Sequence, residues 1–272
     1  MSTRRVRYLA EMGIPLFALR RAAGGDARAP APGGARAGNA LAAAPADPAE
    51  PDFGPSERRA EAAAGAPQRA AERAVGVVPP DASHDADAWR ALEAEVRDCT
   101  RCPLHRGRTQ TVFGVGRRDA SLLVVGEAPG EEEDRQGEPF VGPAGRLLNA
   151  MLKAIGLSRE QVYIANILKC RPPGNRDPRP EEADACAAYL DRQIALIRPR
   201  AMLAVGRVSA QRLLGTDQPV GRLRGAVHRY GPAAIPLVVT YHPAYLLRTP
   251  IAKAKSWQDL CMLVPLLASS VA

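Results

Sequence analysis

Apolar and polar residues follow two different periods in the second part of the chain. Short, nearly continuous apolar runs predict buried strands at residues 121–126, 162–167, 201–206 and 236–241. Apolar residues three and four positions apart predict helices at residues 87–98, 142–155, 180–197, 208–214 and 253–267. Strands that alternate with helices are joined by crossovers, which favours parallel pairing. We therefore expect residues 86–272 to form a three-layer α/β/α sandwich with a four-stranded, mainly parallel central sheet.

The first part of the chain has a different composition. Residues 22–85 consist mainly of Ala, Gly and Pro, and such a segment buries too little apolar surface to offset the entropy of ordering. We predict a disordered linker there. The preceding residues 1–21 include a short apolar and basic segment, residues 5–21, which is too small for a domain. Glu11 and Pro15 interrupt its apolar stretch, so we expect no secretory signal and, along the whole chain, no membrane span.

The charge and the cysteine count narrow the function classes. The 272-residue chain has a formal net charge of +8, and nearly all of the excess lies in residues 86–272. A basic domain favours an acidic partner such as nucleic acid, although the same balance also serves solubility. Five cysteines, an odd number without a secretory signal, indicate a reducing compartment such as the cytoplasm.

Polar residues stand at the carboxyl ends of three predicted strands. Glu127 follows the first strand, the second ends at Asn166, and His242 follows the fourth. Each of them alone is explained as a turn or cap residue. Ligands of parallel sheets bind beyond the carboxyl ends of the strands, so a carboxylate, an amide and an imidazole at corresponding ends favour an active site.

Four of the cysteines form two pairs, Cys99 with Cys102 and Cys170 with Cys186. Four thiolates from two distant segments suit a tetrahedral metal ion or an iron–sulfur cluster, and the spacing alone favours zinc at least as much. The fifth, Cys261, falls in the last predicted helix and is expected to be a core residue.

Five segments together resemble the type-four, iron–sulfur uracil-DNA glycosylases. They are GEAPGEEED (126–134), EPFVGPAGRLL (138–148), NILKCRPPGNRDP (166–178), GRLRG (221–225) and HPAYLLR (242–248). The resemblance implies an enzyme that flips uracil out of DNA and hydrolyses its N-glycosidic bond, which starts base-excision repair. It also implies a [4Fe-4S] cluster on Cys99, Cys102, Cys170 and Cys186.

The resemblance assigns a role to each residue of the uracil pocket. Phe140 stacks on the base, Asn166 reads its polar edge, and His242 donates to O2 as negative charge builds there. The pocket lining includes Gly126, Glu127 and Ala128. The best-known uracil glycosylases have an Asp where Ala128 stands, so another carboxylate positions the water; Glu127 is the first candidate and Glu133 the second. Glu131 and Glu132 are read as a helix N-terminus.

The same resemblance implies a DNA-binding surface. The segment HPAYLLR resembles a wedge that fills the gap left by the flipped base. Its alternative is the start of a buried helix. The candidate DNA contacts are Arg176, Arg222, Arg224, Tyr245, Leu246, Leu247 and Arg248.

Two other readings of the catalytic domain remain. One is a non-catalytic iron–sulfur DNA-binding module, which has no need of a uracil pocket. The other is a relative that crosslinks to uracil-containing DNA through an inserted basic loop. No such insertion lies between Gly221 and His228, so we expect His228 to be structural.

The expected partner is uracil-containing DNA, either single- or double-stranded. We expect the enzyme to be a monomer, located in a bacterial-type cytoplasm and associated with the nucleoid. The sequence Ile14-Pro15-Leu16-Phe17 faintly resembles peptides that bind the bacterial sliding clamp, so residues 5–21 are a candidate recruitment peptide. The alternative is that they fold back onto the catalytic domain.

Overall fold

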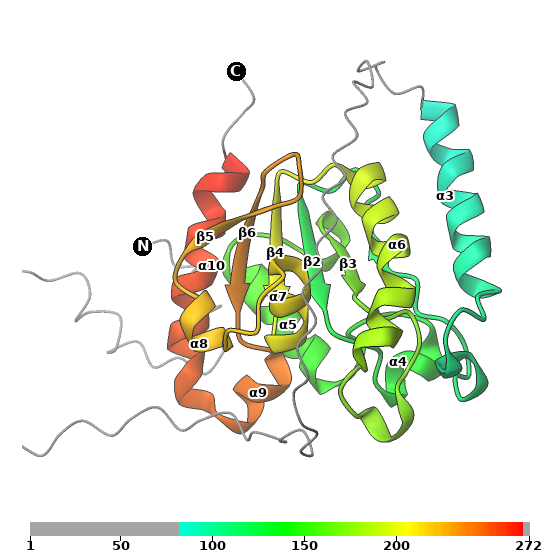
Figure 1. Ribbon diagram of the computed structural model, residues 1–272. Coiled ribbons are helices and arrows are strands. Elements are labelled where there is room, and N and C mark those ends of the chain that lie inside the picture. The colour runs from blue at the N-terminus through cyan, green and yellow to red at the C-terminus, as the bar shows by residue number, and fades with distance from the viewer. Residues whose placement is uncertain (1–81, 269–272) are drawn as a thin grey trace, which may run out of the picture. The chain divides into compact units, whose positions relative to one another are not determined.

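The computed structural model describes residues 82–268, and a six-stranded sheet forms their centre (Figure 1). The spatial order of the strands is β1-β3-β2-β4-β6-β5. Their bounds are β1 Val115–Gly116, β2 Leu122–Gly126, β3 Tyr163–Asn166, β4 Ala201–Val205, β5 Val227–Tyr230 and β6 Ile235–Thr240. The segment 1–21 and almost all of the predicted linker lie outside the described residues.

The four strands expected from the apolar runs form the parallel centre of the sheet. Val124 in β2 lies beside Ile164 on one side and Leu203 on the other, and Leu203 lies beside Val238. All four side chains are fully buried. Apolar runs of this kind are typical of strands covered on both faces.

The expectation of four strands was wrong, because an antiparallel strand is added at each edge of the sheet. β1 has only two residues, and in β5 exposed and half-buried residues alternate. Neither strand has the continuous apolar run that identifies a central strand, since an edge strand is covered less completely.

Helices cover both faces of the sheet, which confirms the three layers (Figure 1). Right-handed crossovers place α5 on one face and both α6 and α7 on the other. The helix α9 packs against α5, and α10 packs against β6. The bounds are α3 Ala82–Arg97, α4 Glu131–Gln136, α5 Pro143–Ala154, α6 Pro180–Ile197, α7 Arg207–Leu214, α8 Val220–Leu223, α9 Pro243–Arg248 and α10 Lys253–Ala268, with 3-10 turns η1 Pro103–Arg106, η2 Arg159–Gln161, η3 Pro173–Asn175 and η4 Pro250–Ala252.

Two details of the helices differ from the expectations. The helix α3 begins at Ala82, before the domain boundary expected at residue 86. Cys261 in α10 is exposed and is not a core residue, because its neighbours Leu260 and Leu263 occupy the buried face of the helix. Among the described residues, no helix is long and apolar enough to cross a membrane.

The four parallel strands all end at one edge of the sheet, the lower edge in Figure 1, where α4 and α9 lie. The loops after these strands therefore meet at this edge. This is the part of an open parallel sheet where ligands bind.

Candidate active site

Three side chains from different loops meet where β2 ends. A methyl group built on Gly126 would collide with the amide oxygen of Asn166 and would lie 2.6 Å from the ring of Phe140. The Phe140 ring stacks on the imidazole of His242, with 5.7 Å between ring centroids and 30° between the planes. Gly206 at the end of β4 lies against His242 in the same way, since an added Cβ would be 3.0 Å from that of His242. The structure thus brings together the predicted Gly126, Phe140, Asn166 and His242.

Asn166 is the most constrained polar residue of this cluster. Its side chain is buried, and its Oδ1 atom has no hydrogen-bond partner within the protein. A buried acceptor without a partner costs free energy, so such an atom calls for an explanation. Its place beside an aromatic ring, at the end of a central strand, makes it available to a planar, polar ligand.

Phe140 holds its place through an unusual backbone conformation. Its φ angle is +56°, in the left-handed region that a bulky residue adopts only at a cost. The helix α5 begins directly behind it, and a side chain at Gly145 would collide with the carbonyl of Phe140. Gly145 therefore allows the close approach that places the Phe140 ring in the cluster.

Glu133 and Arg159 hold the Phe140 loop from two sides. Oε1 of Glu133 accepts hydrogen bonds from the backbone N–H groups of Val141 at 3.0 Å and Gly142 at 3.2 Å. Its Oε2 accepts from Gly130 N–H at 3.1 Å and so caps α4. Arg159 donates to the carbonyls of Pro139 at 2.5 Å and Phe140 at 3.3 Å. Both oxygens of Glu133 thus accept hydrogen bonds from the backbone, which gives this residue a structural role in the Phe140 loop.

Glu127 directly follows β2 and is half-buried, and Ala128 after it is half-buried as well. The backbone here is fixed by hydrogen bonds from the end of β3. Ile167 N–H donates to the carbonyl of Gly126 and Leu168 N–H to that of Glu127, both at 3.0 Å. The loop that carries Glu127 is therefore tied to the strand that carries Asn166.

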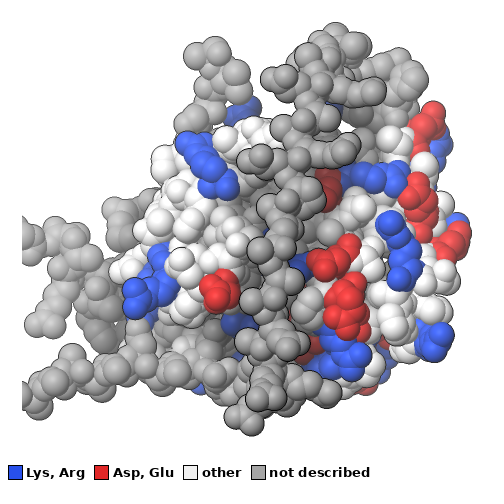
Figure 2. Space-filling view, viewed as in Figure 1, with Lys and Arg blue, Asp and Glu red and all other residues white. Residues whose placement is uncertain are grey.

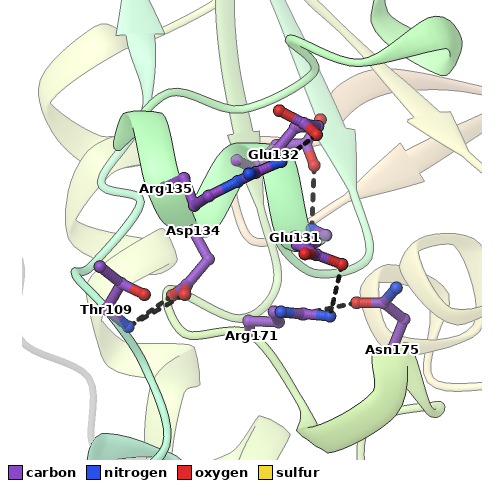
Figure 3. A network of polar contacts seen from close by, with 9 residues as sticks. Thr109, Glu131, Glu132, Asp134, Arg135, Arg171 and Asn175 are labelled. Atoms are coloured by element: carbon purple, nitrogen blue, oxygen red, sulfur yellow. Dashed lines mark hydrogen bonds and ion pairs between the residues drawn. The ribbon is translucent and has the colours of Figure 1, made fainter.

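The remaining acidic residues of α4 have structural partners (Figure 3). Asp134 is buried and accepts from the backbone N–H of Thr109 with both oxygens, at 2.9 and 3.0 Å. Glu131 pairs with Arg171, which also donates to the side chain of Asn175 at 2.7 Å. Glu132 pairs with Arg135 in the same helix. Their position in the first turn of α4 agrees with the expected helix N-terminus.

His242 is held as a neutral imidazole. Its Nδ1 accepts a hydrogen bond from the backbone N–H of Ala244 at 3.2 Å, so in the neutral ring the proton is on Nε2. Burial, and to a smaller extent the charge of Arg248, lowers the pKa of His242 to about 4, while Glu133 acts in the opposite direction. At neutral pH this residue can therefore donate a hydrogen bond through Nε2 without carrying a charge.

The four predicted cysteine ligands lie around one pocket, next to His105, Arg108 and Tyr189. Cys170 and Cys186 are buried, whereas Cys99 and Cys102 are half-buried. Sulfur atoms here accept three N–H hydrogen bonds, from Arg108 to Cys170 at 3.2 Å, from Lys169 to Cys186 at 3.3 Å and from Arg101 to Cys99 at 3.5 Å. Within residues 82–268, no three His, Cys, Asp or Glu side chains are placed to hold one metal ion.

Residues 113–261 match the family model of the Uracil DNA glycosylase superfamily. The match covers more than half of the chain and contains the whole cluster around Gly126. The chain belongs to the uracil-DNA glycosylase superfamily. Within this superfamily it is 47 % identical over 163 residues to the type-4 uracil-DNA glycosylase of Archaeoglobus fulgidus, an alignment that covers 57 % of this chain and 81 % of that protein.

Two further relatives indicate the branch of the superfamily. The type-4 uracil-DNA glycosylase of Thermotoga maritima is 46 % identical, with 58 % of this chain and 82 % of that protein covered. The type-5 uracil-DNA glycosylase of Thermus thermophilus is 32 % identical, with 48 % and 68 % covered. The identity to the type-4 proteins is thus clearly higher.

The structure corrects two of the DNA contacts expected for this superfamily member, Leu246 and Arg224. Leu246 is fully buried in the core, so it cannot enter a duplex. Arg224 donates to both oxygens of buried Asp259, at 2.8 and 3.1 Å, and Arg176 pairs in the same bidentate way with Glu182, at 2.5 and 2.9 Å. The Arg224 side chain is only 14 % exposed and is therefore held inside the fold, whereas the Arg176 side chain is 33 % exposed, so its contact with DNA stays a prediction.

The other expected DNA contacts stay predictions. Leu247, Arg248 and Arg222 are exposed, whereas Tyr245 is half-buried and packs on Tyr241 with 5.0 Å between ring centroids. On the face shown in Figure 2, basic and acidic side chains lie next to one another over α3 and α6, as in the pair of Arg192 and Glu95 at 2.5 Å. The α9 edge, where Leu247 and Arg248 are exposed, stays the candidate surface for DNA.

His228 has the structural role that its sequence context predicted, since its Nε2 donates to the carbonyl of Leu223 at 2.7 Å. The sequence reading missed Arg159 and Lys169. Arg159 lies among polar residues in the turn η2, and nothing near it in the sequence indicates a contact with Phe140. Lys169 did carry a signal, because it is a single lysine in an otherwise apolar stretch at the end of β3.

Proposed function

We propose that this chain is a type-4 uracil-DNA glycosylase, which removes uracil from DNA and so starts base-excision repair. The observation that carries the proposal is the buried, unpartnered Oδ1 of Asn166 beside Phe140 and His242. A side-chain amide has one acceptor and one donor group on a planar frame, so it can bond N3–H and O4 of uracil. The amino group of cytosine would oppose the amide donor, which gives the pocket its selectivity.

The reaction breaks the bond between the base and the sugar, and negative charge collects on the departing uracil. Nε2–H of His242 can donate to O2 of that anion, and because the ring is neutral it keeps its proton through the reaction. Phe140 provides the stacking face for the flipped base. Glu127, beside the end of β2, orients the water that attacks the sugar.

The activity is tested with two otherwise identical oligonucleotides, one of which contains a single uracil. After incubation and alkali treatment, we expect strand breakage at the uracil position only. A protein that binds DNA but breaks neither strand would be a non-catalytic module. A covalent protein–DNA adduct that survives denaturation would indicate the crosslinking relative.

We also propose that Cys99, Cys102, Cys170 and Cys186 hold a [4Fe-4S] cluster. Each cysteine of such a cluster binds a different iron, so the sulfurs surround a space and need not meet at one point. Four sulfurs around one pocket, with N–H donors on three of them, suit such a cluster, and the resemblance to the iron–sulfur glycosylases favours it over a single zinc ion. When bound, the cluster would link the end of α3 to α6 and the loop after β3.

The cluster is tested on protein purified without oxygen. We expect a brown protein with about four irons per chain and broad visible absorption. One zinc per chain and no iron would overturn the assignment. The same preparation serves for the activity test, so the two results can be compared directly.

Residues 5–21 lie outside the described residues, and we propose that they recruit the enzyme to a partner such as a sliding clamp. Residues 22–85 would then be the tether between this segment and the catalytic domain. We also propose that the enzyme is monomeric and cytoplasmic. Deleting residues 1–21 should leave the melting temperature and the activity on short oligonucleotides unchanged. A melting temperature lower by several degrees would mean that the segment is part of the fold.

A further inference from the structure

Lys169 is a buried cation between the cysteine pocket and the predicted uracil pocket. Its side chain is 1 % exposed, which makes it the largest of the fully buried side chains. Lysine is rarely buried so completely, because its charge loses the solvation that water provides. A position of this kind calls for a role that an apolar side chain could not fill.

The contacts of Lys169 point in two directions. Its ammonium group donates to the backbone carbonyl of Asn166 at 3.0 Å and to Oε1 of Gln193 at 2.7 Å. Its backbone N–H donates to the sulfur of Cys186 at 3.3 Å. One residue thus touches both the base-reading strand end and the cysteine site.

Gln193 fixes the far side of this arrangement. Its Nε2 donates to the carbonyl of Phe113 at 3.0 Å and to the hydroxyl of Tyr163 in β3 at 3.3 Å. The lysine ammonium is therefore held between a fixed acceptor on α6 and the carbonyl of Asn166. The orientation of that carbonyl sets the direction in which the Asn166 side chain leaves the backbone.

We propose that Lys169 is a positioning residue for uracil recognition, which holds the Asn166 backbone so that its amide meets the polar edge of the base. The inference rests on the proposed function of Asn166. An apolar residue at position 169 would leave two buried acceptors, the Asn166 carbonyl and Oε1 of Gln193, without a donor. Of the Asn166–Ile167 peptide, only the N–H end would then be held, by its hydrogen bond to the Gly126 carbonyl, so the Asn166 amide would lose part of its fixed direction.

The test is equilibrium binding of the full-length protein to single-stranded oligonucleotides that carry one 2′-fluoro nucleotide, which resists cleavage. One oligonucleotide carries uracil at this position and the other cytosine. Lys169→Met keeps the length of the side chain and removes its donors. We expect the preference for uracil over cytosine to fall about tenfold, which corresponds to about 1.4 kcal/mol. Lys153→Met, on the exposed side of α5, is the matched control and should keep the preference.

A second comparison separates positioning from a general structural effect. Asn166→Ala should lower the preference by more than Lys169→Met does, and adding Lys169→Met to it should cause no further loss of the remaining preference, because the lysine acts through Asn166. An additive loss would overturn the proposal. So would an unchanged preference in Lys169→Met protein that keeps the wild-type iron content and melting temperature.

Gln193→Met provides a second variant in case Lys169→Met does not fold, since it keeps the ammonium bond to the Asn166 carbonyl and removes the contacts of Gln193 with Lys169, Phe113 and Tyr163. We expect a smaller loss of preference in the same direction, and an unchanged preference in this variant also counts against the proposal. Wild-type protein that binds both oligonucleotides equally and releases no uracil from normal substrate would instead refute the proposed function. The two failures are therefore distinguishable.

Discussion

Replacing Glu133 by Gln separates two roles that a carboxylate near this pocket can have. In the structure, the Glu133 oxygens accept hydrogen bonds from the backbone of Gly130, Val141 and Gly142. This geometry assigns Glu133 to the support of the Phe140 loop. We expect Glu127, which follows β2, to be the carboxylate that orients water.

The expected loss of stability in Glu133→Gln follows from the number of acceptor oxygens that the side chain keeps. A Gln side chain has one oxygen, so if that oxygen serves Val141 and Gly142, its amide group faces the N–H of Gly130 and one charge-assisted hydrogen bond is lost. Such a bond contributes about 1.5–3 kcal/mol when buried, and Glu133 is half-buried, so we expect a loss of about 1–2 kcal/mol. For a domain of this size that lowers the melting temperature by about 2–8 °C.

The assay combines thermal unfolding with single-turnover uracil excision from a single-stranded oligonucleotide at 25 °C. For Glu133→Gln we expect a lower melting temperature and excision within about tenfold of wild type. For Glu127→Gln we expect excision slower by about 100-fold or more, the size of a lost general base.

Glu132→Gln is the matched control, because Glu132 lies in the same helical turn and pairs with the exposed Arg135 of the same helix. It should change neither quantity. If Glu133→Gln keeps the wild-type melting temperature and slows excision as much as Glu127→Gln, Glu133 itself orients the water and the support role is wrong.

Four further outcomes are expected. Asn166→Ala should slow excision by about 100- to 1000-fold, the size of one preorganised donor or acceptor, in single-turnover kinetics. Burial lowers the pKa of His242 to about 4 from an unfolded value of about 6.5, so the unfolded chain binds the proton more readily than the folded one. The contribution of His242 to stability is therefore complete above pH 6.5 and is lost as the pH falls toward 4. An NMR titration of His242 with a midpoint near 6.5 would contradict this. Leu246→Ala should cost about 2–5 kcal/mol of unfolding free energy, while exposed Leu247→Ala should leave stability unchanged and weaken only duplex binding. DNA affinity should fall with salt with a log–log slope of several units, and a flat response would mean that the positive charge does not contact phosphates.

Much of the site was predictable because local patterns and one rule of parallel sheets were sufficient. The apolar runs identified all four central strands, since strands covered on both faces contain few polar residues. Once those strands are parallel, the residues after them meet at one edge, and Asn166 and His242 do lie in one cluster with Phe140. The edge strands β1 and β5 escaped prediction because their half-exposed surfaces require no apolar run.

The sequence by itself determined which residues come to the catalytic edge, because strand identity, strand direction and the polar residues at strand ends are local properties. The tertiary structure alone decided what several side chains do there. Glu133 serves a loop that begins several residues later, Arg224 meets Asp259 across 35 positions, and Leu246 turns into the core while Leu247 does not. These partners come together only when separate elements pack, and hydrogen bonding depends on distances of about 3 Å that no local pattern encodes.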